Sequence, residues 1–222
     1  FAGGAIFFGL GLGIAGSGTL IPLLLEWGLQ ATWIGLGLFS LLLVAASWFA
    51  WPQAAPRQQE AVQATATLRA GSALTVLYIQ YGLFAAGVVA PMVFLVDYVA
   101  RGLGQGAHVG AGFWVLYGLG AILGPLGYGR LADWIGNRRT LQSVLVVQVL
   151  AISLLLASPH LVTTGIAAVL IGSFPPGAVP LVLHRVHHLL PGNPQAQSAA
   201  WSRATVIFAV VQAASGYAYS WL

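Results

Sequence analysis

Seven long apolar runs, separated by short polar stretches, dominate this sequence. A helix needs roughly 20 mainly apolar residues to cross the hydrocarbon core of a bilayer. The runs have about that length and lack the strict alternation of a half-buried strand, and open sheet edges are not tolerated in lipid. We therefore predict an all-α, polytopic membrane protein with transmembrane helices at residues 2–25, 32–50, 71–98, 109–128, 141–157, 162–183 and 199–222.

Composition excludes several classes of protein. Charged residues make up 5% of the chain and hydrophobic residues 59%, whereas about a quarter of a soluble domain is charged. The absence of cysteine excludes disulfides and thiolate metal sites. The basic residues are eight arginines, and in a membrane protein such charge reflects loop topology, so we expect no nucleic-acid partner.

The arginines also predict which side of the membrane each connection occupies. Residues 51–69 form the long polar stretch and read as a linker between two membrane sub-domains. If the chain crosses the bilayer at each predicted helix, Arg101 falls on one side and the other arginines on the opposite side. The positive-inside rule then makes residues 51–69 and 129–139 cytoplasmic.

The densest charge lies in a turn, residues 129–139, between two apolar runs. Its pattern resembles a loop signature of the major facilitator superfamily, and the residues that match are Gly129, Leu131, Ala132, Asp133, Gly136, Arg138 and Arg139. The stretches 113–121, 124–125 and 200–205 are similar to the YbfB/YjiJ-like branch of that superfamily. The resemblance covers nearly the whole chain.

The resemblance implies twelve helices in two halves, of which this chain would hold helices 5 to 11. Residues 1–50 would end the first half, residues 51–69 would be the central linker, and residues 70–222 would belong to the second half. The chain begins with Phe1, and we expect a fragment of a longer protein that does not transport alone. The implied setting is the inner (plasma) membrane of a bacterium.

The implied function is secondary active transport of a small organic solute by alternating access, with a proton as the candidate coupling ion. The alternative is a membrane-embedded sensor or scaffold with the same fold. No cluster of residues within the predicted spans suits catalysis, so we expect no enzyme and no cofactor. The sequence leaves the solute, the coupling ion and the oligomeric state open.

The charged turn is the predicted conformational gate, with Gly129, Asp133, Gly136, Arg138 and Arg139 as its residues. Carboxylates are stabilised at the positive N-terminal end of a helix. The internal symmetry implied by the family brings this turn to the start of the first helix, residues 2–4. We hypothesise that Asp133 accepts hydrogen bonds there when the inner side is closed. The alternative is that these charges only set topology.

A second group of residues is predicted to line the solute cavity. Polar side chains inside a membrane usually face protein or water, and the family's cavity is lined by its helices 7, 8, 10 and 11. Adjacent prolines remove backbone donors and can break a helix beside a solute path. For each residue the alternative is a structural role, as an interhelical hydrogen bond or a packed kink. The candidates are Gln80, Tyr81, Trp114, Tyr117, Pro175, Pro176 and Gln212.

Asp97 is a carboxylate near a helix interior and a candidate for proton coupling. It precedes Arg101 by four residues, so an i,i+4 ion pair at the interface is the simpler interpretation. Gln148 is expected to be structural. His184, His187 and His188 have helical metal-ligand spacing but lie at the predicted cytoplasmic interface, so we expect no metal site.

Small residues four apart predict close contacts between helices in lipid. Two such pairs occur, Gly9 with Gly13 and Gly120 with Gly124.

Overall fold

The computed structural model describes residues 2–50 and 68–221, with side chains from Phe7 to Phe49 and from Gly71 to Trp221. Those residues form seven α-helices and two short helical segments, without a strand among them. The helices are α1 (Ala2–Leu25), α2 (Leu29–Ser47), α3 (Leu68–Asp97), α4 (Ala107–Ile135), α5 (Asn137–Ala157), α6 (Leu161–Leu189) and α7 (Pro194–Ser220). A 3-10 segment, η1 (Trp48–Ala50), follows α2, and a π-helical segment, η2 (Tyr98–Gly102), follows α3.

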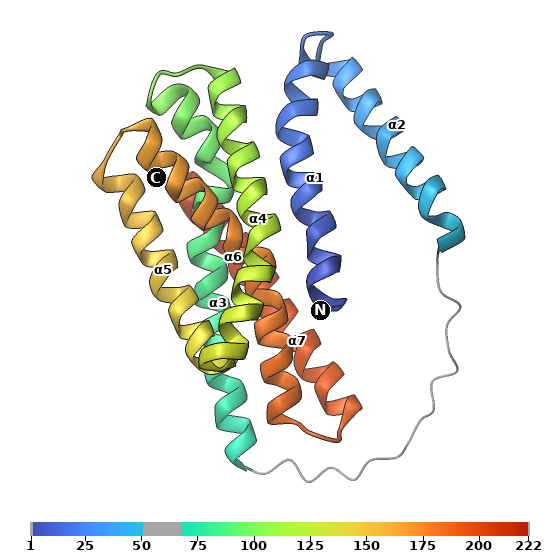
Figure 1. Ribbon diagram of the computed structural model, residues 1–222, viewed down its shortest axis with the longest axis vertical. Coiled ribbons are helices and arrows are strands. Elements are labelled where there is room, and N and C mark those ends of the chain that lie inside the picture. Colours follow the sequence, from blue (N-terminus) through green and yellow to red (C-terminus); the bar gives the residue numbers. More distant parts are fainter. Residues whose placement is uncertain (1, 51–67, 222) are drawn as a thin grey trace.

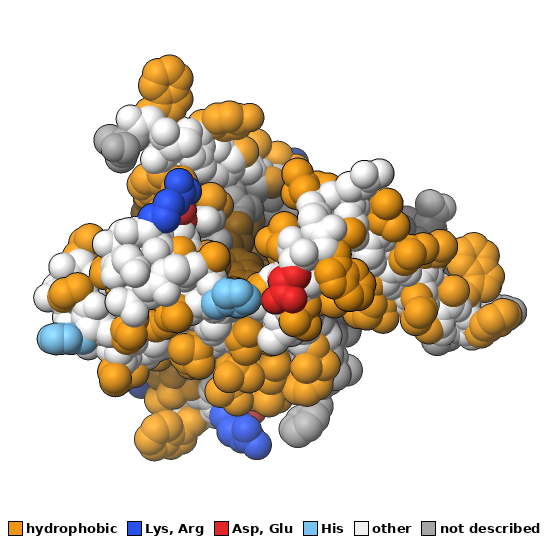
Figure 2. Space-filling view, turned by 90° about the horizontal axis from the view of Figure 1, so that it is seen from above, with side chains coloured by type: hydrophobic (Ala, Val, Ile, Leu, Met, Phe, Trp, Pro, Cys, Tyr) orange, Lys and Arg blue, Asp and Glu red, His pale blue; other side chains and the backbone are white. Residues whose placement is uncertain are grey.

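Six of these helices are long and apolar enough to cross a membrane. The helix outside that set among the described residues is α7, which has 27 residues but a more polar first half that includes Gln195, Gln197 and Arg203. Hydrophobic side chains dominate the surface seen from above (Figure 2). Exposed leucines, valines and tryptophans on α2 and α5 fit contact with lipid, where apolar side chains need no cover.

The helices run alternately up and down (Figure 1). The turns α1–α2, α3–α4 and α5–α6 lie at one end of the molecule, and the turns α4–α5 and α6–α7 lie at the other, together with the start of α3 (Figure 1). Most side chains of the buried core come from α3 and α6. By contrast, α2 stands apart and buries one residue, Thr32, among those described.

Glycines let α4 and α6 pack backbone to backbone. A Cβ atom at Gly120 would lie 2.0 Å from the carbonyl oxygen of Val169, and one at Gly124 would lie 2.2 Å from that of Ser173. Gly172 of α6 faces α4 in the same way, since its Cβ atom would lie 1.9 Å from the carbonyl oxygen of Tyr117. The predicted close contact at Gly120 and Gly124 is confirmed.

The predicted contact at Gly9 and Gly13 is wrong, because a Cβ atom at either position would meet nothing within 4 Å. The face of α1 that approaches α4 instead carries Gly11, Ala15 and Gly18. Small residues on that face fit the same physical rule, displaced by two positions.

The charged turn is much shorter than predicted. Helix α4 continues to Ile135 and α5 begins at Asn137, so Gly136 alone separates them. Gly136 has φ +87°, a left-handed conformation that a residue without a Cβ adopts at little cost. Residues 129–135, which include the charged Arg130 and Asp133, therefore lie on the last turns of a helix.

Of the two interpretations of Pro175 and Pro176, a broken helix is excluded and a packed kink remains, because α6 is continuous from Leu161 to Leu189. Pro176 is buried, and Ser173 one turn earlier shares a hydrogen bond with Tyr128 of α4 (Oγ–Oη 2.7 Å). Packing against α4 thus supports this part of α6, as it does for helices that tolerate proline in membranes.

Candidate functional site

A mostly apolar pocket of about 580 Å³ lies where α1, α3 and α4 meet. Its walls come from helices on both sides of the polar stretch 51–69. The lining residues are Ser17, Gly18, Ile21, Pro22 and Leu25 of α1, Glu26 of the turn after it, Met92, Val93 and Val96 of α3, and Ala107, His108, Ala111 and Trp114 of α4. A concave, largely apolar cavity with a few polar groups is the usual form of a small-molecule site.

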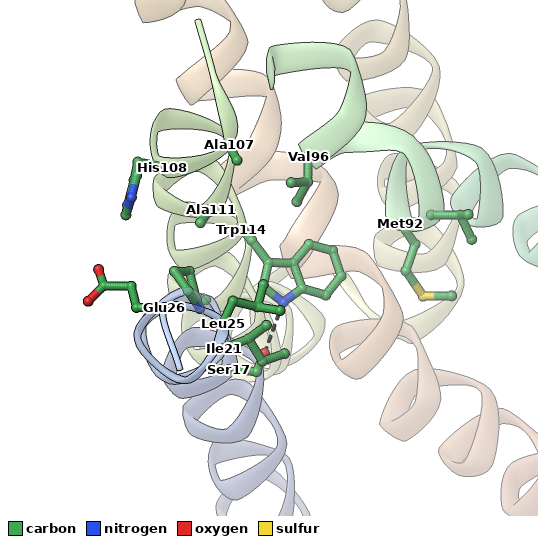
Figure 3. Close-up of a pocket in the computed structure, with 13 residues that line it drawn as sticks. Ser17, Ile21, Leu25, Glu26, Met92, Val96, Ala107, His108, Ala111 and Trp114 are labelled. Carbon is green, nitrogen blue, oxygen red and sulfur yellow. Dashed lines mark hydrogen bonds between the residues drawn. The ribbon is translucent and has the colours of Figure 1, made fainter. Parts of the chain in front are cut away.

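Trp114 joins two walls of this pocket. Its indole Nε1 donates a hydrogen bond to Ser17 Oγ (3.0 Å; Figure 3), and the Ser17 hydroxyl donates to the carbonyl oxygen of Ile14 (2.8 Å). Tyr117 stacks on the indole with ring centroids 4.8 Å apart and an interplanar angle of 12°. The indole is therefore held in one orientation by α1 and α4 together.

Tyr117 lies in the layer behind Trp114 and is 1% exposed. Its hydroxyl is buried without a hydrogen-bond partner among the described residues. Gln212 of α7 also lies in a second layer, because its Nε2 contacts the sulfur of Met92 (3.9 Å), and Met92 lines the pocket. Both predicted cavity residues are thus adjacent to the pocket through another side chain.

Glu26 and His108 bring polarity to one side of the pocket. Glu26 lies in the turn that follows α1 and His108 lies in the first turn of α4, and both side chains are exposed (Figure 3). Among the lining residues Glu26 is the carboxylate, and none is an arginine. The pocket consequently combines an aromatic wall with a single acidic group.

Other predicted cavity residues lie elsewhere. Tyr81 belongs to an aromatic cluster between α3 and α7, with its ring centroid 4.8 Å from that of Phe208. Gln80 and Tyr81 border a void of about 10 Å³, too small for a solute. Pro175 and Pro176 do not line the pocket between α1, α3 and α4. Contact of the solute with Gln80, Tyr81, Pro175 or Pro176 therefore stays a prediction.

The structure pairs Asp97 with Arg101, as the four-residue spacing predicts. Both side chains are largely exposed, at 47% and 83% respectively. The amide of Gln148 is buried and donates to the carbonyl oxygen of Phe84 (3.2 Å), which confirms its structural role. No group of three or more potential metal ligands occurs in the part of the chain that the structure describes.

At the opposite end, Asp133 and Arg130 border a hollow of about 530 Å³ between α4 and α6. Gly129, Gly136 and His184 also line it. The side chain of Asp133 is exposed, and its carboxylate has no ion pair or hydrogen bond with any described residue. Arg138 and Arg139 line a neighbouring cavity between the start of α5 and the end of α6.

Sequence reasoning missed Ser17, Glu26, Met92 and His108 as pocket residues. Ser17 interrupts a glycine-rich apolar run, and Glu26 is the carboxylate that ends it, so the sequence around each marks it as an unusual polar residue. Nothing in the sequence around Met92 and His108 marks them as pocket residues, because their position beside α1 depends on how distant helices pack.

The fold and its apolar surface define a polytopic α-helical membrane protein with an open pocket between α1, α3 and α4. A family model described as "Uncharacterised MFS-type transporter YbfB" matches residues 1–222, and the chain belongs to this family of the major facilitator superfamily. Membership makes it an integral membrane protein of a transporter family, which implies a small-molecule solute and a bilayer setting; such families are generally non-enzymatic. No curated protein and no solved structure matched the chain.

Proposed function

We propose that the protein is a secondary transporter that moves a small, mainly apolar organic solute by alternating access, and that the pocket between α1, α3 and α4 is part of its path. The observation that carries this proposal is the origin of the pocket walls, which come from helices before and after the 51–69 stretch. In transporters of this kind, one repeat rocks against the other around a site between them.

The contact between α1 and α4 suits such rocking. Gly11 lies against Ile122, Ala15 against Gly118, and Gly18 against Val115. Few large side chains interlock between the two helices on this face. A tilt of α1 against α4 would therefore break few interdigitated contacts while changing the width of the pocket.

The pocket's chemistry supports a class of solute. Its surface is mainly apolar, with the face of Trp114 as one wall and Glu26 at one side. An indole attracts apolar groups and, through its ring quadrupole, cations. We therefore expect an uncharged or cationic solute, since Glu26 would repel an anion.

Solute counterflow tests the proposal, using the full-length protein in sealed vesicles and a panel of neutral, cationic and anionic organic solutes. We expect counterflow of at least one neutral or cationic member. The Trp114→Ala variant should lower its apparent affinity about tenfold or more, as truncating a central aromatic anchor does in other sites. Trp33→Ala is the matched control, because Trp33 is 70% exposed on α2, outside the pocket.

Counterflow that Trp114→Ala leaves unchanged would place the solute path elsewhere. Absence of counterflow across the whole panel would instead favour a sensor or scaffold with a transporter fold. Exclusive movement of anions would contradict the role given to Glu26.

A further inference from the structure

A basic cavity of about 350 Å³ lies where α5 begins and α6 ends, at the opposite end of the bundle from the α3–α4 turn (Figure 1). The residues that line it are Ile135, Gly136, Asn137, Arg138, Arg139, His184, Arg185 and His188. Three of them are arginines and two are histidines, whereas none is a carboxylate. The proposed transport function does not use this cavity.

The arginines of this basic cavity have no ion-pair partner among the described residues, and Asp133 is the carboxylate that lines the adjoining hollow. None of its arginines forms an ion pair with a described carboxylate. The ion pair found among the described residues joins Arg101 and Asp97, at the other end of the bundle. Arg138 and Arg139 lie in the first turn of α5, where the helix macrodipole disfavours cations. Grouped positive charges of this kind repel one another, and attraction to a bound anion would offset that repulsion.

The walls of the cavity are fixed by hydrogen bonds. Asn137 Nδ2 donates to the carbonyl oxygen of Leu181 (3.1 Å), which ties the start of α5 to α6. Thr140 Oγ1 donates to the carbonyl oxygen of Gly136 (3.0 Å) and holds the turn. Arg185 is partly buried. The basic groups therefore converge because of the fold, and topology alone would require only that they share one side of the membrane.

The cavity lies beside a residue typical of the membrane interface. Trp134, at the end of α4, is 85% exposed and adjoins Ile135 of the cavity wall. Exposed tryptophans gather at the headgroup level of bilayers. Basic pockets between membrane helices at this level bind anionic headgroups, and the planar guanidinium group matches phosphate oxygens in pairs.

We infer that the basic cavity binds a phosphate group, and that the headgroup of an anionic phospholipid supplies it. The same chemistry would accept the phosphate of a soluble molecule, so the experiment must separate the two sources.

The test titrates purified full-length protein with dioctanoyl phosphatidylglycerol, dioctanoyl phosphatidylcholine or inorganic phosphate, and follows binding by native mass spectrometry and melting temperature. We expect phosphatidylglycerol to bind about tenfold or more tightly than phosphatidylcholine. Arg139→Gln and Arg185→Gln should each remove most of that preference. Arg203→Gln is the matched control, since Arg203 is an exposed arginine near the start of α7 and does not line the cavity.

Arg138→Gln replaces an exposed side chain and serves if Arg185→Gln does not fold. Equal binding of the two lipids without phosphate binding, or wild-type preference in every cavity variant, would overturn the inference. Binding of inorganic phosphate that the cavity variants lose, without a preference between lipids, would support the phosphate site and overturn its assignment to lipid.

Discussion

Single glycines decide how closely α4 and α6 approach. At Gly172, a Cβ atom would overlap the carbonyl oxygen of Tyr117, and backbone atoms cannot move aside as the end of a flexible side chain can. The same carbonyl belongs to the residue that stacks on Trp114. A change at Gly172 would thus reach the pocket through Tyr117, although Gly172 itself does not line it.

We predict that Gly172→Ala destabilises the protein by about 1–3 kcal/mol, the usual cost of forcing an extra methyl group into a packed core. The matched control is Gly112→Ala in α4, where a Cβ atom would meet nothing within 4 Å. Alanine should stabilise that helix position by about 0.5–1 kcal/mol. Melting temperatures of the purified variants in detergent measure both effects. A Gly172→Ala protein as stable as wild type would show that the two helices can separate freely.

At the scale of helices, the antiparallel register of α1 on α4 concerns the proposed gate. Gly18 pairs with Val115, Ala15 with Gly118, and Gly11 with Ile122. Each step toward the start of α1 therefore matches a step toward the end of α4. Extending this register places residues 2–4 opposite 129–131, one turn before Asp133. This supports the proposal that Asp133 faces the positive end of α1 when the inner side is closed.

We predict that Asp133→Asn shifts the protein toward the inward-open state by about two- to fivefold, because a charge at a helix terminus contributes about 0.3–1 kcal/mol. The chain contains no cysteine, so Val96→Cys in the pocket can report access to a membrane-impermeant thiol reagent. Labelling from the cytoplasmic side should rise and labelling from outside should fall.

Asp97→Asn is the control for this gate, because Asp97 pairs with Arg101 at the other end of the bundle. It should leave the cytoplasmic labelling of Val96→Cys unchanged. If the Val96→Cys protein is labelled equally with and without Asp133→Asn, the role of Asp133 is to set topology alone.

Across the whole molecule, the sequence predicted which segments span the membrane. It predicted few of the contacts between those segments, with Gly120 and Gly124 as the exception. The apolar runs predicted the helices because lipid leaves the backbone no other partner. The charges of Arg130 and Asp133 made residues 129–135 read as part of a turn, yet α4 continues through them until Gly136. Charged side chains indicate where the bilayer ends, whereas α4 ends where Gly136 adopts a left-handed backbone conformation.

The residues predicted for the candidate site also fall into two groups, those that the structure places at the pocket and those that it places elsewhere. Trp114 was predicted from its own span, and the structure places it in the pocket. Tyr81 has the same amphipathic character but packs on Phe208. A single sequence does not show which neighbour an aromatic ring meets. The hydrogen bond between Trp114 and Ser17 links residues 97 positions apart, which only the packing of α1 on α4 could reveal.

The orientation of the whole molecule gives the last prediction. Arg130, Arg138, Arg139 and Arg185 lie toward the end of the bundle that holds the α4–α5 and α6–α7 turns, whereas Arg101 follows α3 at the opposite end. Excess arginine marks the cytoplasmic side. We therefore expect Gln195→Cys, near the α6–α7 turn, to resist an impermeant maleimide in intact cells and to react after permeabilisation.

His160→Cys, in the α5–α6 turn, should react in intact cells, since it is exposed at the opposite end. Labelling of Gln195→Cys but not His160→Cys in intact cells would invert the topology, and would move the proposed phosphate site to the outer leaflet. Labelling of both would contradict a membrane-spanning α6. Because the turns are joined by one continuous helix, Leu161–Leu189, the two measurements together test a complete crossing as well as its direction.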